Sequence, residues 1–480
     1  MARQTRRDFL KTSLAASAAF STFTIAGTKS SGNVLGANEA IRIGVIGCGG
    51  RGGAHINTWA GMKGVDLTYL VDPDMQRANP TRADQLYAKT QVRPRALQDV
   101  RQALEDKDLD AVSVATCNHW HSLITIWACQ AGKDVYVEKP LSHNIHEGRI
   151  AVEAAHKHGR IVQHGTQSRS SGRWLSKRQA IESGELGKLR VSRGLCYKKR
   201  PSIGVKPVET PPEDLAFDLW LGPAPVQPYH KNLVHYNWHW FWDFGNGDIG
   251  NQGVHQMDIA RWMIPGATWP KSVMCLGGRF GYTDQGQTPN TQLAVFDYGE
   301  TLLIFEVRGL VDRADTSNLQ SFEQGGATAK LATPSDAEVA EVARSVKGAA
   351  ADRGPGGDTF GNFIECVRSR KQEDLDAHVL EGHYSSGLCH LANISFRLGQ
   401  DVPFNKQTKA FGDDKEAYAT FERMQDHLKD SGLKLEETTY RLGRRLEFDP
   451  VQEQFVGDAE ANALLTRVPR PPFIVPEKIA

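Results

Sequence analysis

IRIGVIGCGGRGGAH, residues 41–55, opens the folded part of the chain and indicates its architecture. The first six residues form an apolar run typical of a buried strand, and three glycines follow in the spacing GxGxxG. Glycines at these positions allow a tight turn and let the backbone approach a pyrophosphate, which binds at the N-terminus of the next helix. We therefore predict a dinucleotide-binding strand–turn–helix unit, with the cofactor held at Gly47, Gly49, Gly50, Arg51 and Gly52.

Asp72 ends the next predicted strand, GVDLTYLV, twenty residues beyond Gly52. A carboxylate at this place accepts hydrogen bonds from the adenosine ribose hydroxyls and repels a 2′-phosphate. We therefore predict NAD as the cofactor. Arg77 is close enough in sequence to bind a 2′-phosphate, so the sequence leaves NADP open.

Strands and helices alternate from residue 41 to about residue 165, a pattern that predicts a parallel, doubly wound α/β sheet covered on both faces. Ligands of such sheets bind beyond the carboxyl ends of the strands. The polar residues that we expect there, as further cofactor contacts, are Thr116, Asn118, His121, Glu138 and Lys139. From the residues alone, a solvated lysine at the end of a strand is an equally good interpretation of Lys139.

The whole chain has 480 residues, seven scattered cysteines and a formal net charge of +1. This length suffices for two or three domains. The small charge gives no reason to expect nucleic acid as a partner, and no apolar run beyond residue 40 is long enough to span a membrane. The dispersed cysteines argue against a disulfide framework or a metal site.

Residues 1–37 differ in composition from the rest of the chain. Arg6 and Arg7, within TRRDFLK, match the twin-arginine consensus and precede a short, mildly apolar run. This arrangement predicts a Tat signal peptide and therefore an exported, periplasmic protein. A basic, disordered tail is the alternative interpretation.

Two later motifs, EKP at residues 138–140 and GVHQMD at residues 253–258, complete a recognisable set. Together with the early GxGxxG, they resemble the Gfo/Idh/MocA oxidoreductases, a family that includes glucose–fructose oxidoreductase and inositol dehydrogenase. LWLGPAP at residues 219–225 and the tail at residues 449–465 resemble the bacterial branch that has a longer C-terminal domain.

The resemblance implies three folded parts after the signal peptide. A Rossmann domain at residues 38–165 binds NAD(P), and an α+β domain with an open, mostly antiparallel sheet at residues 166–400 serves in substrate binding and oligomerisation. A C-terminal extension at residues 401–480 packs on the second domain. The implied assembly is a homodimer or homotetramer.

The resemblance also implies roles for Lys139, beside the nicotinamide, and for His255, as an acid–base group or as a group that orients the reacting alcohol. Many family members have an aspartate four residues before this histidine, where this chain has Asn251. An asparagine cannot exchange a proton in the useful range, so we expect proton transfer by His255, by Lys139, or by a carboxylate such as Asp243 or Asp248.

The stretch YNWHWFWDFGNGDIGNQGVHQMD, residues 236–258, is crowded with aromatic side chains. Its tryptophans alternate with other rings, which predicts an extended segment with one set of rings on each face. Aromatic faces suit the C–H patches of a sugar, although we expect at least half of the rings to be structural. The predicted substrate contacts are Trp238, Asn251, Gln252, His255 and Asp258. A capping or helix-surface carboxylate is the alternative for Asp258.

The predicted function is NAD(P)-dependent oxidation or reduction at a secondary hydroxyl of a sugar, glycoside or cyclitol. Export implies a tightly bound cofactor, because free NAD is scarce outside the cytoplasm. Two alternatives remain at this stage. One is a redox-neutral, glycosidase-like enzyme that oxidises C3 transiently and eliminates the aglycone. The other is a non-catalytic carbohydrate-binding protein, an interpretation that Asn251 keeps open.

Overall fold

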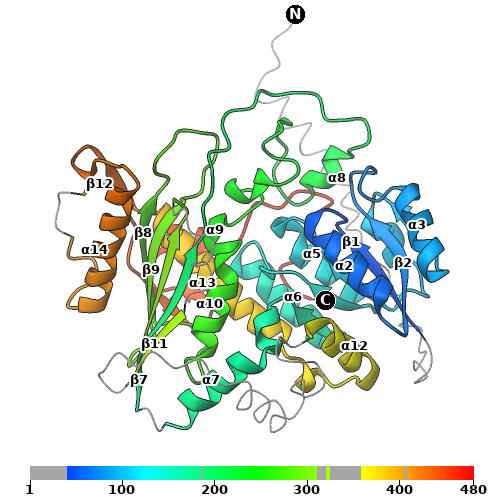
Figure 1. The fold of residues 1–480 in the computed structure, drawn as a ribbon, viewed down its shortest axis with the longest axis horizontal. Coiled ribbons are helices and arrows are strands. Elements are labelled where there is room, and N and C mark those ends of the chain that lie inside the picture. The colour runs from blue at the N-terminus through cyan, green and yellow to red at the C-terminus, as the bar shows by residue number, and fades with distance from the viewer. Residues whose placement is uncertain (1–39, 185–186, 311–319, 325–357, 405–407, 480) are drawn as a thin grey trace, which may run out of the picture.

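The computed structural model describes residues 40–184, 187–310, 320–324, 358–404 and 408–479. The predicted signal peptide lies outside the described residues. The described residues form two sheets with their helices, and the sheets stand side by side in the molecule (Figure 1).

The first sheet has six parallel strands in the order β3-β2-β1-β4-β5-β6. Parallel strands that are covered on both faces consist mainly of apolar residues, and β1 is buried along almost its whole length. The strands are β1 (Ile41–Ile46), β2 (Val65–Val71), β3 (Arg95–Leu97), β4 (Ala111–Val114), β5 (Asp134–Val137) and β6 (Val162–His164). The helices are α2 (Gly50–Gly61), α3 (Pro80–Thr90), α4 (Val100–Leu104), α5 (Asn118–Gln130) and α6 (Ile145–Lys157). This strand order confirms the predicted dinucleotide-binding Rossmann fold.

The second sheet has nine strands, in the order β11-β7-β10-β9-β8-β13-β12, with β14 beside β8 and β15 beside β14. Among the described strand pairs of this second sheet, only β7 and β10 run parallel, so the sheet is mostly antiparallel, as expected. The strands are β7 (Leu189–Tyr197), β8 (Ser272–Gly278), β9 (Thr291–Asp297), β10 (Leu302–Arg308), β11 (Gln320–Gln324), β12 (Gln400–Pro403), β13 (Thr439–Leu442), β14 (Leu446–Asp449) and β15 (Gln454–Phe455).

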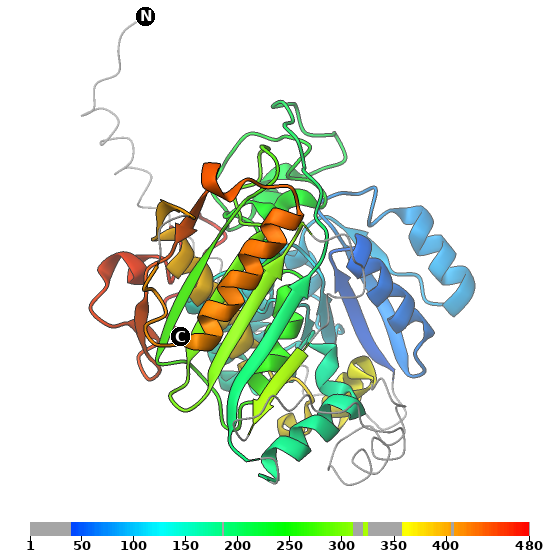
Figure 2. The same ribbon diagram turned by 60° about the vertical axis from the view of Figure 1, so that its left-hand side comes forward.

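Helices cover both faces of this sheet. The inner face packs on α10 (Gly253–Trp262) and α13 (Val379–Arg397), and the outer face packs on α14 (Lys415–Asp430), which lies across the strands in Figure 2. Side chains of β10 alternate between the two layers, because successive residues of a strand point to opposite faces. Phe305 belongs to the inner core and Ile304 to the outer one.

The remaining helical segments join the domains or flank the sheets. They are η1 (Gln167–Ser170), α7 (Gly172–Glu182), α8 (Phe217–Leu221), η2 (Asn237–Trp240), α9 (Gly247–Gly250), α12 (Thr359–Ser369), η4 (Gln372–Asp374), η5 (Leu435–Glu437) and α15 (Ala459–Ala463). None of the helices in the described residues combines the length and the apolar character that a membrane span requires.

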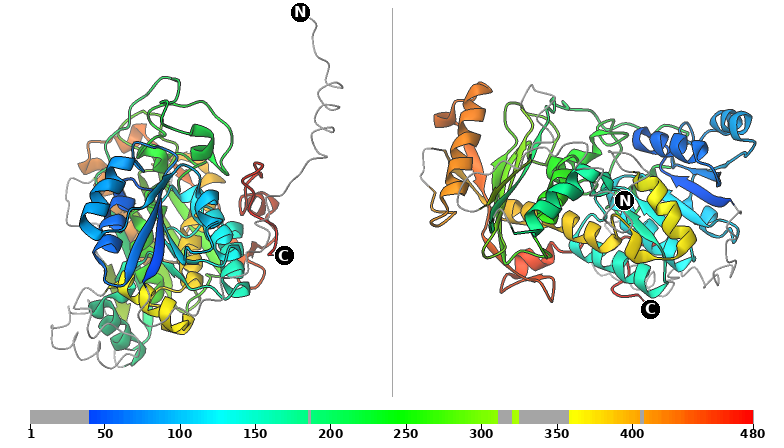
Figure 3. Two further views of the ribbon diagram at one scale, coloured as in Figure 1. Left: turned by 90° about the vertical axis from the view of Figure 1, so that its right-hand side faces the viewer. Right: turned by 60° about the horizontal axis from the view of Figure 1, so that its bottom comes forward.

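Two segments from the later part of the chain return to the Rossmann domain. Phe363 of α12 packs beside Trp59, and Phe473 packs edge-on against Trp120. The extension that we expected on the second domain is therefore divided between the two domains. Its α14 covers the second sheet, whereas its end runs beside α5 and α6 of the first domain (Figure 3).

A buried ion pair ties the chain that leaves the Rossmann sheet to the inner layer of the second domain. Arg169 of η1 donates from Nε to Asp258 Oδ2 at 2.9 Å, and its guanidinium lies over the ring of Trp262 at 5.0 Å. Ser385 Oγ donates to the same carboxylate at 2.6 Å. Asp258 is fully buried, so its charge depends on these partners.

We predict that Asp258→Ala lowers the free energy of unfolding by about 3–5 kcal/mol, because it leaves the Arg169 charge without its main buried partner. Chemical denaturation measures this change. The control is Asp426→Ala, which removes an exposed pair with Lys429 and should cost less than about 1 kcal/mol. If Asp258→Ala instead keeps normal stability and raises KM, Asp258 is a substrate contact, as the sequence predicted.

Candidate active site

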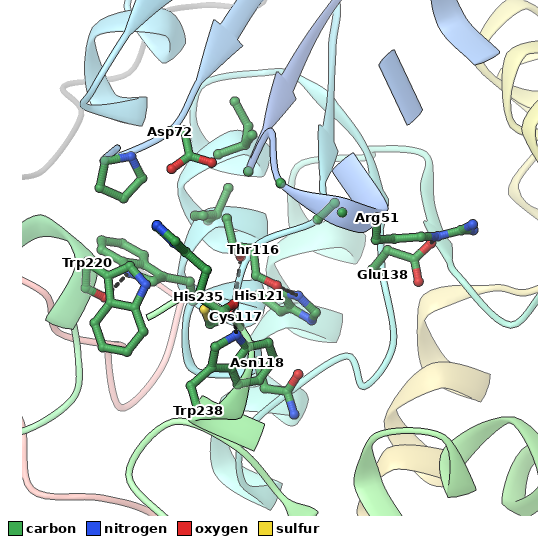
Figure 4. Close-up of a pocket in the computed structure, with 18 of the residues that line it drawn as sticks. Arg51, Asp72, Thr116, Cys117, Asn118, His121, Glu138, Trp220, His235 and Trp238 are labelled. Carbon is green, nitrogen blue, oxygen red and sulfur yellow. Dashed lines mark hydrogen bonds and ion pairs between the residues drawn. The ribbon is translucent and has the colours of Figure 1, made fainter. Parts of the chain in front are cut away.

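A cavity of about 450 Å³ lies where the two domains meet. The predicted site residues that line it from the Rossmann domain are Gly47, Gly49, Gly50, Arg51, Asp72, Thr116, Asn118, His121, Glu138 and Lys139. Those from the second domain are Trp238, Asn251 and His255. Gln252 and Asp258 are not among the described residues of the lining, and neither is Gly52. Figure 4 shows Asp72 and the Arg51–Glu138 pair on different sides of the strand ends.

The glycine loop between β1 and α2 has no room for a side chain at Gly47 or Gly52. Gly47 has a φ of +86°, and a Cβ built on Gly52 would lie 1.7 Å from the carbonyl oxygen of Gly47. Gly49 caps α2 without a side-chain hydrogen bond, so the first N–H groups of the helix remain available to a phosphate. This cradle fits the pyrophosphate of a dinucleotide.

Asp72 stands at the carboxyl end of β2, beside the glycine loop. Its carboxylate accepts hydrogen bonds from the backbone N–H groups of Cys48, at 2.8 Å, and Asp74, at 3.0 Å, which hold it in place. Burial raises the pKa of Asp72. Arg77 lies over Gly49 and also lines the cavity, so a cation is present close to the place where a 2′-phosphate would bind.

Glu138 follows β5 and is held by two basic groups. Arg51 Nε donates to its carboxylate at 2.8 Å, and His55 Nε2 lies 3.0 Å from the same oxygen. Burial alone would raise the pKa of Glu138, but the hydrogen bond from His55 and the charges of Arg51 and Lys139 hold that pKa well below its ordinary value. Glu138 is therefore an anion that orients its surroundings, and His55 is a partner that the sequence did not indicate.

Lys139 extends from the end of β5 into the cavity and meets the second domain there. Its ammonium donates to the backbone carbonyl of Asn251 at 2.7 Å and lies 3.4 Å from the Asn251 side-chain oxygen. Burial lowers the pKa of Lys139. The neighbouring strand end is fixed in a similar way, because Asn118 Nδ2 donates to Asn246 Oδ1 at 3.0 Å. Both predicted strand-end residues thus connect the two domains.

His255 lies in the first turn of α10 and lines the cavity. Burial, together with the charge of Lys139, lowers its pKa to about 3, so the ring is neutral at neutral pH. Among the described residues, none donates to or accepts from either ring nitrogen by a hydrogen bond. His255 is therefore free to meet a substrate, but its tautomer is not fixed.

The carboxylates considered as substitutes for the missing aspartate have other partners. Asp248 receives two hydrogen bonds from Arg200, at 2.8 and 3.0 Å, and Asp243 accepts from Gln227 Nε2 at 3.1 Å. Neither is among the described residues that line the cavity. They are not placed to take a proton from a substrate.

The aromatic stretch does not form the expected extended segment. Residues 237–240 form the 3₁₀ helix η2, and Phe241 N donates back to Trp238 O at 3.1 Å. The alternation in sequence was misleading because each ring has its own partner: Trp240 packs on Arg200, and Trp238 stacks on His239 with ring centroids 3.6 Å apart. One face of Trp238 is therefore already covered.

Several lining residues were not predicted as site residues. They are Arg77, Trp120, Gln167, Trp220, His235, Tyr236 and His239. For His235, Tyr236 and His239, the available signal was the aromatic-rich stretch that they begin or adjoin. A loop that carries both aromatic rings and imidazoles so close to GVHQMD is expected near the same strand ends. No comparable sequence signal marks Trp120 or Gln167.

The strand order and the glycine cradle define a dinucleotide-binding Rossmann domain, which is followed by a second, α+β domain. Residues 41–166 match the Gfo/Idh/MocA sequence model described as an oxidoreductase family, NAD-binding Rossmann fold. Residues 196–431 match the model of that family's C-terminal alpha/beta domain. The chain belongs to the Gfo/Idh/MocA oxidoreductase family, and its first domain is an NAD-binding Rossmann domain.

Curated relatives match over part of their length. Inositol 2-dehydrogenase of Corynebacterium glutamicum is 28% identical over 169 residues, which cover 35% of this chain and 48% of that protein. The NAD(+)-dependent scyllo-inositol 2-dehydrogenase of Bacillus subtilis is 30% identical over 149 residues, covering 31% of this chain and 42% of that protein. The chain thus matches less than half the length of each.

A solved structure resembles the chain over most of its length. The WlbA dehydrogenase from Bordetella pertussis, in complex with NADH and UDP-GlcNAcA, has a TM-score of 0.54 and 18% sequence identity. The likeness covers 75% of this chain and 97% of that chain. At this identity the likeness concerns the fold alone.

We predict that Gly52→Ala abolishes NAD binding, because its methyl group would displace the Gly47 carbonyl that shapes the loop. Gly61→Ala, at the other end of α2, is the control, since a Cβ there meets no atom within 4 Å. Calorimetric titration with NAD measures both variants. Equal affinities would mean that the loop does not hold the cofactor.

Proposed function

We propose that the protein is an NAD-dependent oxidoreductase that acts on a secondary hydroxyl of a sugar, glycoside or cyclitol and retains its cofactor between turnovers. The observation that carries the proposal is the position of Lys139, whose ammonium enters a cavity bordered by the glycine loop of one domain and by His255 of the other. When bound, NAD supplies the hydride acceptor. The names of the curated relatives, inositol dehydrogenases, support a polyol as substrate.

The residues of this chain hold and polarise the substrate. Lys139 has three N–H donors, and its hydrogen bond to the Asn251 carbonyl leaves others for a substrate oxygen. An ammonium fixed in the cavity stabilises the negative charge that develops on the substrate oxygen as the alcohol is oxidised. His255 lies along the same cavity, where it orients the hydroxyl or takes its proton.

Retention of the cofactor is supported by the segment of residues 209–236, which we call the strap. His235 Nε2 of the strap pairs with Asp74 Oδ2 at 2.8 Å, and Met75 N donates to the Asp214 carbonyl at 3.0 Å. These contacts hold the strap against the loop that follows Asp72 and β2. A cofactor with its adenosine at Asp72 would have to pass this contact in order to leave.

The strap also contributes a wall of the cavity. Leu219 and Trp220 line it opposite the Rossmann strand ends, and Trp120 Nε1 donates to the Trp220 carbonyl at 3.2 Å. The strap is thus held at two places, beside Asp74 and beside α5. This double attachment supports slow exchange of the cofactor.

The proposal extends to location and assembly. Export through the Tat pathway to the periplasm is supported by the pair Arg6 and Arg7 and the mildly apolar run that follows. Assembly as a homodimer or homotetramer is supported by the family's use of the open sheet. In this chain α14 covers part of the outer face, which leaves less of it for a second copy.

Lys139→Ala is expected to lower kcat by roughly a hundredfold or more, because the developing alkoxide loses its donor. Binding of NAD should be nearly unchanged. Reduction of bound NAD by myo-inositol, glucose and their methyl ethers or glycosides gives the rate, and calorimetry gives the affinity. Near-normal turnover in the variant would make Lys139 an ordinary strand-end lysine.

For the strap, we predict that His235→Ala speeds the release of NAD several-fold, because the contact between His235 Nε2 and the Asp74 carboxylate is lost. Release is followed by exchange of bound NAD for an isotope-labelled pool. Lys231→Ala is the matched control, because Lys231 lies on the same segment and pairs with Glu209 near the surface. Identical release from wild type and both variants would contradict a retaining role for the strap.

A further inference from the structure

His239 is a cavity residue to which neither the family motifs nor the proposed function gives a role. It lies in η2 and lines the same cavity as Lys139, Asn251 and His255. Lys139 is near enough for its charge to contribute to lowering the pKa of His239. The ring therefore stands close to the point where the proposed reaction takes place.

One ring nitrogen of His239 is assigned by its partner. Nδ1 lies 2.5 Å from the backbone carbonyl oxygen of Tyr236. A carbonyl oxygen can only accept a hydrogen bond, so Nδ1 carries the proton of the neutral ring. Nε2 then carries a lone pair and no proton, and among the described residues no group donates to it. This nitrogen is a ready acceptor.

The orientation of the ring is fixed from two sides. Its face stacks on Trp238 at 3.6 Å with the planes 20° apart, and Trp238 Nε1 in turn donates to the His235 carbonyl at 3.1 Å. Gly245 packs against the backbone of His239, where a Cβ would lie 2.5 Å from its carbonyl oxygen. The first glycine after the aromatic run is thus needed for a close approach that holds His239 in place.

Three other groups of the cavity, Lys139, Glu138 and His255, are less suited to accept the proton. Lys139 donates to the Asn251 carbonyl and, as an ammonium, has no lone pair. Glu138 is held as an anion by Arg51 and His55. His255 has no hydrogen bond that selects its tautomer in the described structure. Of these groups, His239 alone presents a lone pair with a fixed tautomer.

We infer that His239 is a catalytic residue, and that its Nε2 accepts the proton of the substrate hydroxyl while Lys139 stabilises the oxygen. The inference rests on the proposed function. The O–H proton passes to Nε2, the C–H electron pair leaves with its hydrogen to reduce NAD, and the carbinol becomes a ketone. In this chain His239 accepts the proton, in a transfer to which an aspartate at position 251 would otherwise contribute. His255 orients the hydroxyl.

The acidity of the reacting group matches this acceptor. Burial, with the charges of Lys139 and Arg200, lowers the pKa of His239 to about 3, so the ring is neutral and its lone pair is free at neutral pH. As the C–H bond breaks, the hydroxyl proton becomes far more acidic than that of the resting alcohol, because the oxygen of the forming ketone is only weakly basic, and the proton leaves together with the hydride. A weakly basic imidazole is therefore sufficient to take the proton.

Two substitutions separate proton transfer from simple hydrogen bonding. His239→Asn keeps a donor near the place of Nδ1, whereas His239→Gln places an amide oxygen near Nε2 that can accept a hydrogen bond but not a proton at neutral pH. We expect both to lower kcat roughly a hundredfold or more, with NAD affinity unchanged. His158→Gln, at the end of α6 and outside the lining, is the control with normal turnover.

A second readout does not require turnover. Nitrogen NMR of histidine-labelled holoprotein at neutral pH, assigned with the two variants, should show His239 protonated on Nδ1 only. A ring protonated on Nε2 overturns the inference, and so does a Gln variant that restores turnover to within about tenfold of wild type. If wild-type protein reduces no bound NAD with myo-inositol, glucose or methyl glucosides, the proposed function itself fails. That outcome is distinct from a failure of His239 alone.

Discussion

The hydrogen bond from the Lys139 ammonium to the backbone carbonyl of Asn251 is the contact on which the site depends. It joins the end of β5 in the Rossmann domain to the start of α10 in the second domain, so the cavity exists only while the domains keep this arrangement. A buried ammonium needs such an acceptor, because an unpaired charge away from water is costly. An aspartate at position 251 would add a carboxylate beside the ammonium. Asn251 has no such carboxylate, so the positive charge of Lys139 remains available to the substrate oxygen.

Three carboxylates in or near the cavity are paired with cations rather than exposed to substrate. Glu138 binds Arg51, Asp248 binds Arg200, and further away Asp258 binds Arg169. Each pair keeps a charge from being buried alone, and each removes a carboxylate from acid–base chemistry. The groups left to exchange protons are neutral imidazoles. In the mechanism that we propose, histidines take over the task of the family aspartate.

Much of the architecture could be predicted because its determinants are local. The glycine spacing of residues 47–52, the buried parallel strands and the polar residues at strand ends are each readable within one segment, and the structure has them where the sequence indicated. Lys139 and His255 were placed by motifs and meet in one cavity. These features depend on backbone geometry and on strand order, which the alternation of strands and helices already implies.

Features that depend on distant partners were not predictable in this way. Asp258 follows a helix pattern that suits a substrate contact, and only the position of Arg169 reveals its structural pairing. The turn at residues 237–240 and the return of Phe473 to the first domain likewise depend on packing between remote segments. The same holds for the tautomer of His239, because the Tyr236 carbonyl that selects it is positioned by the turn itself.

The central claim is that a carbinol hydrogen of a polyol passes directly to NAD held in this cavity. The most direct measurement is mass spectrometry of the protein-bound cofactor after mixing with carbon-deuterated myo-inositol, glucose or methyl glucoside in ordinary water. The account predicts reduced nicotinamide that carries one deuterium from the substrate. Bound NAD that stays oxidised with every one of these compounds, or reduced cofactor without deuterium, would contradict it.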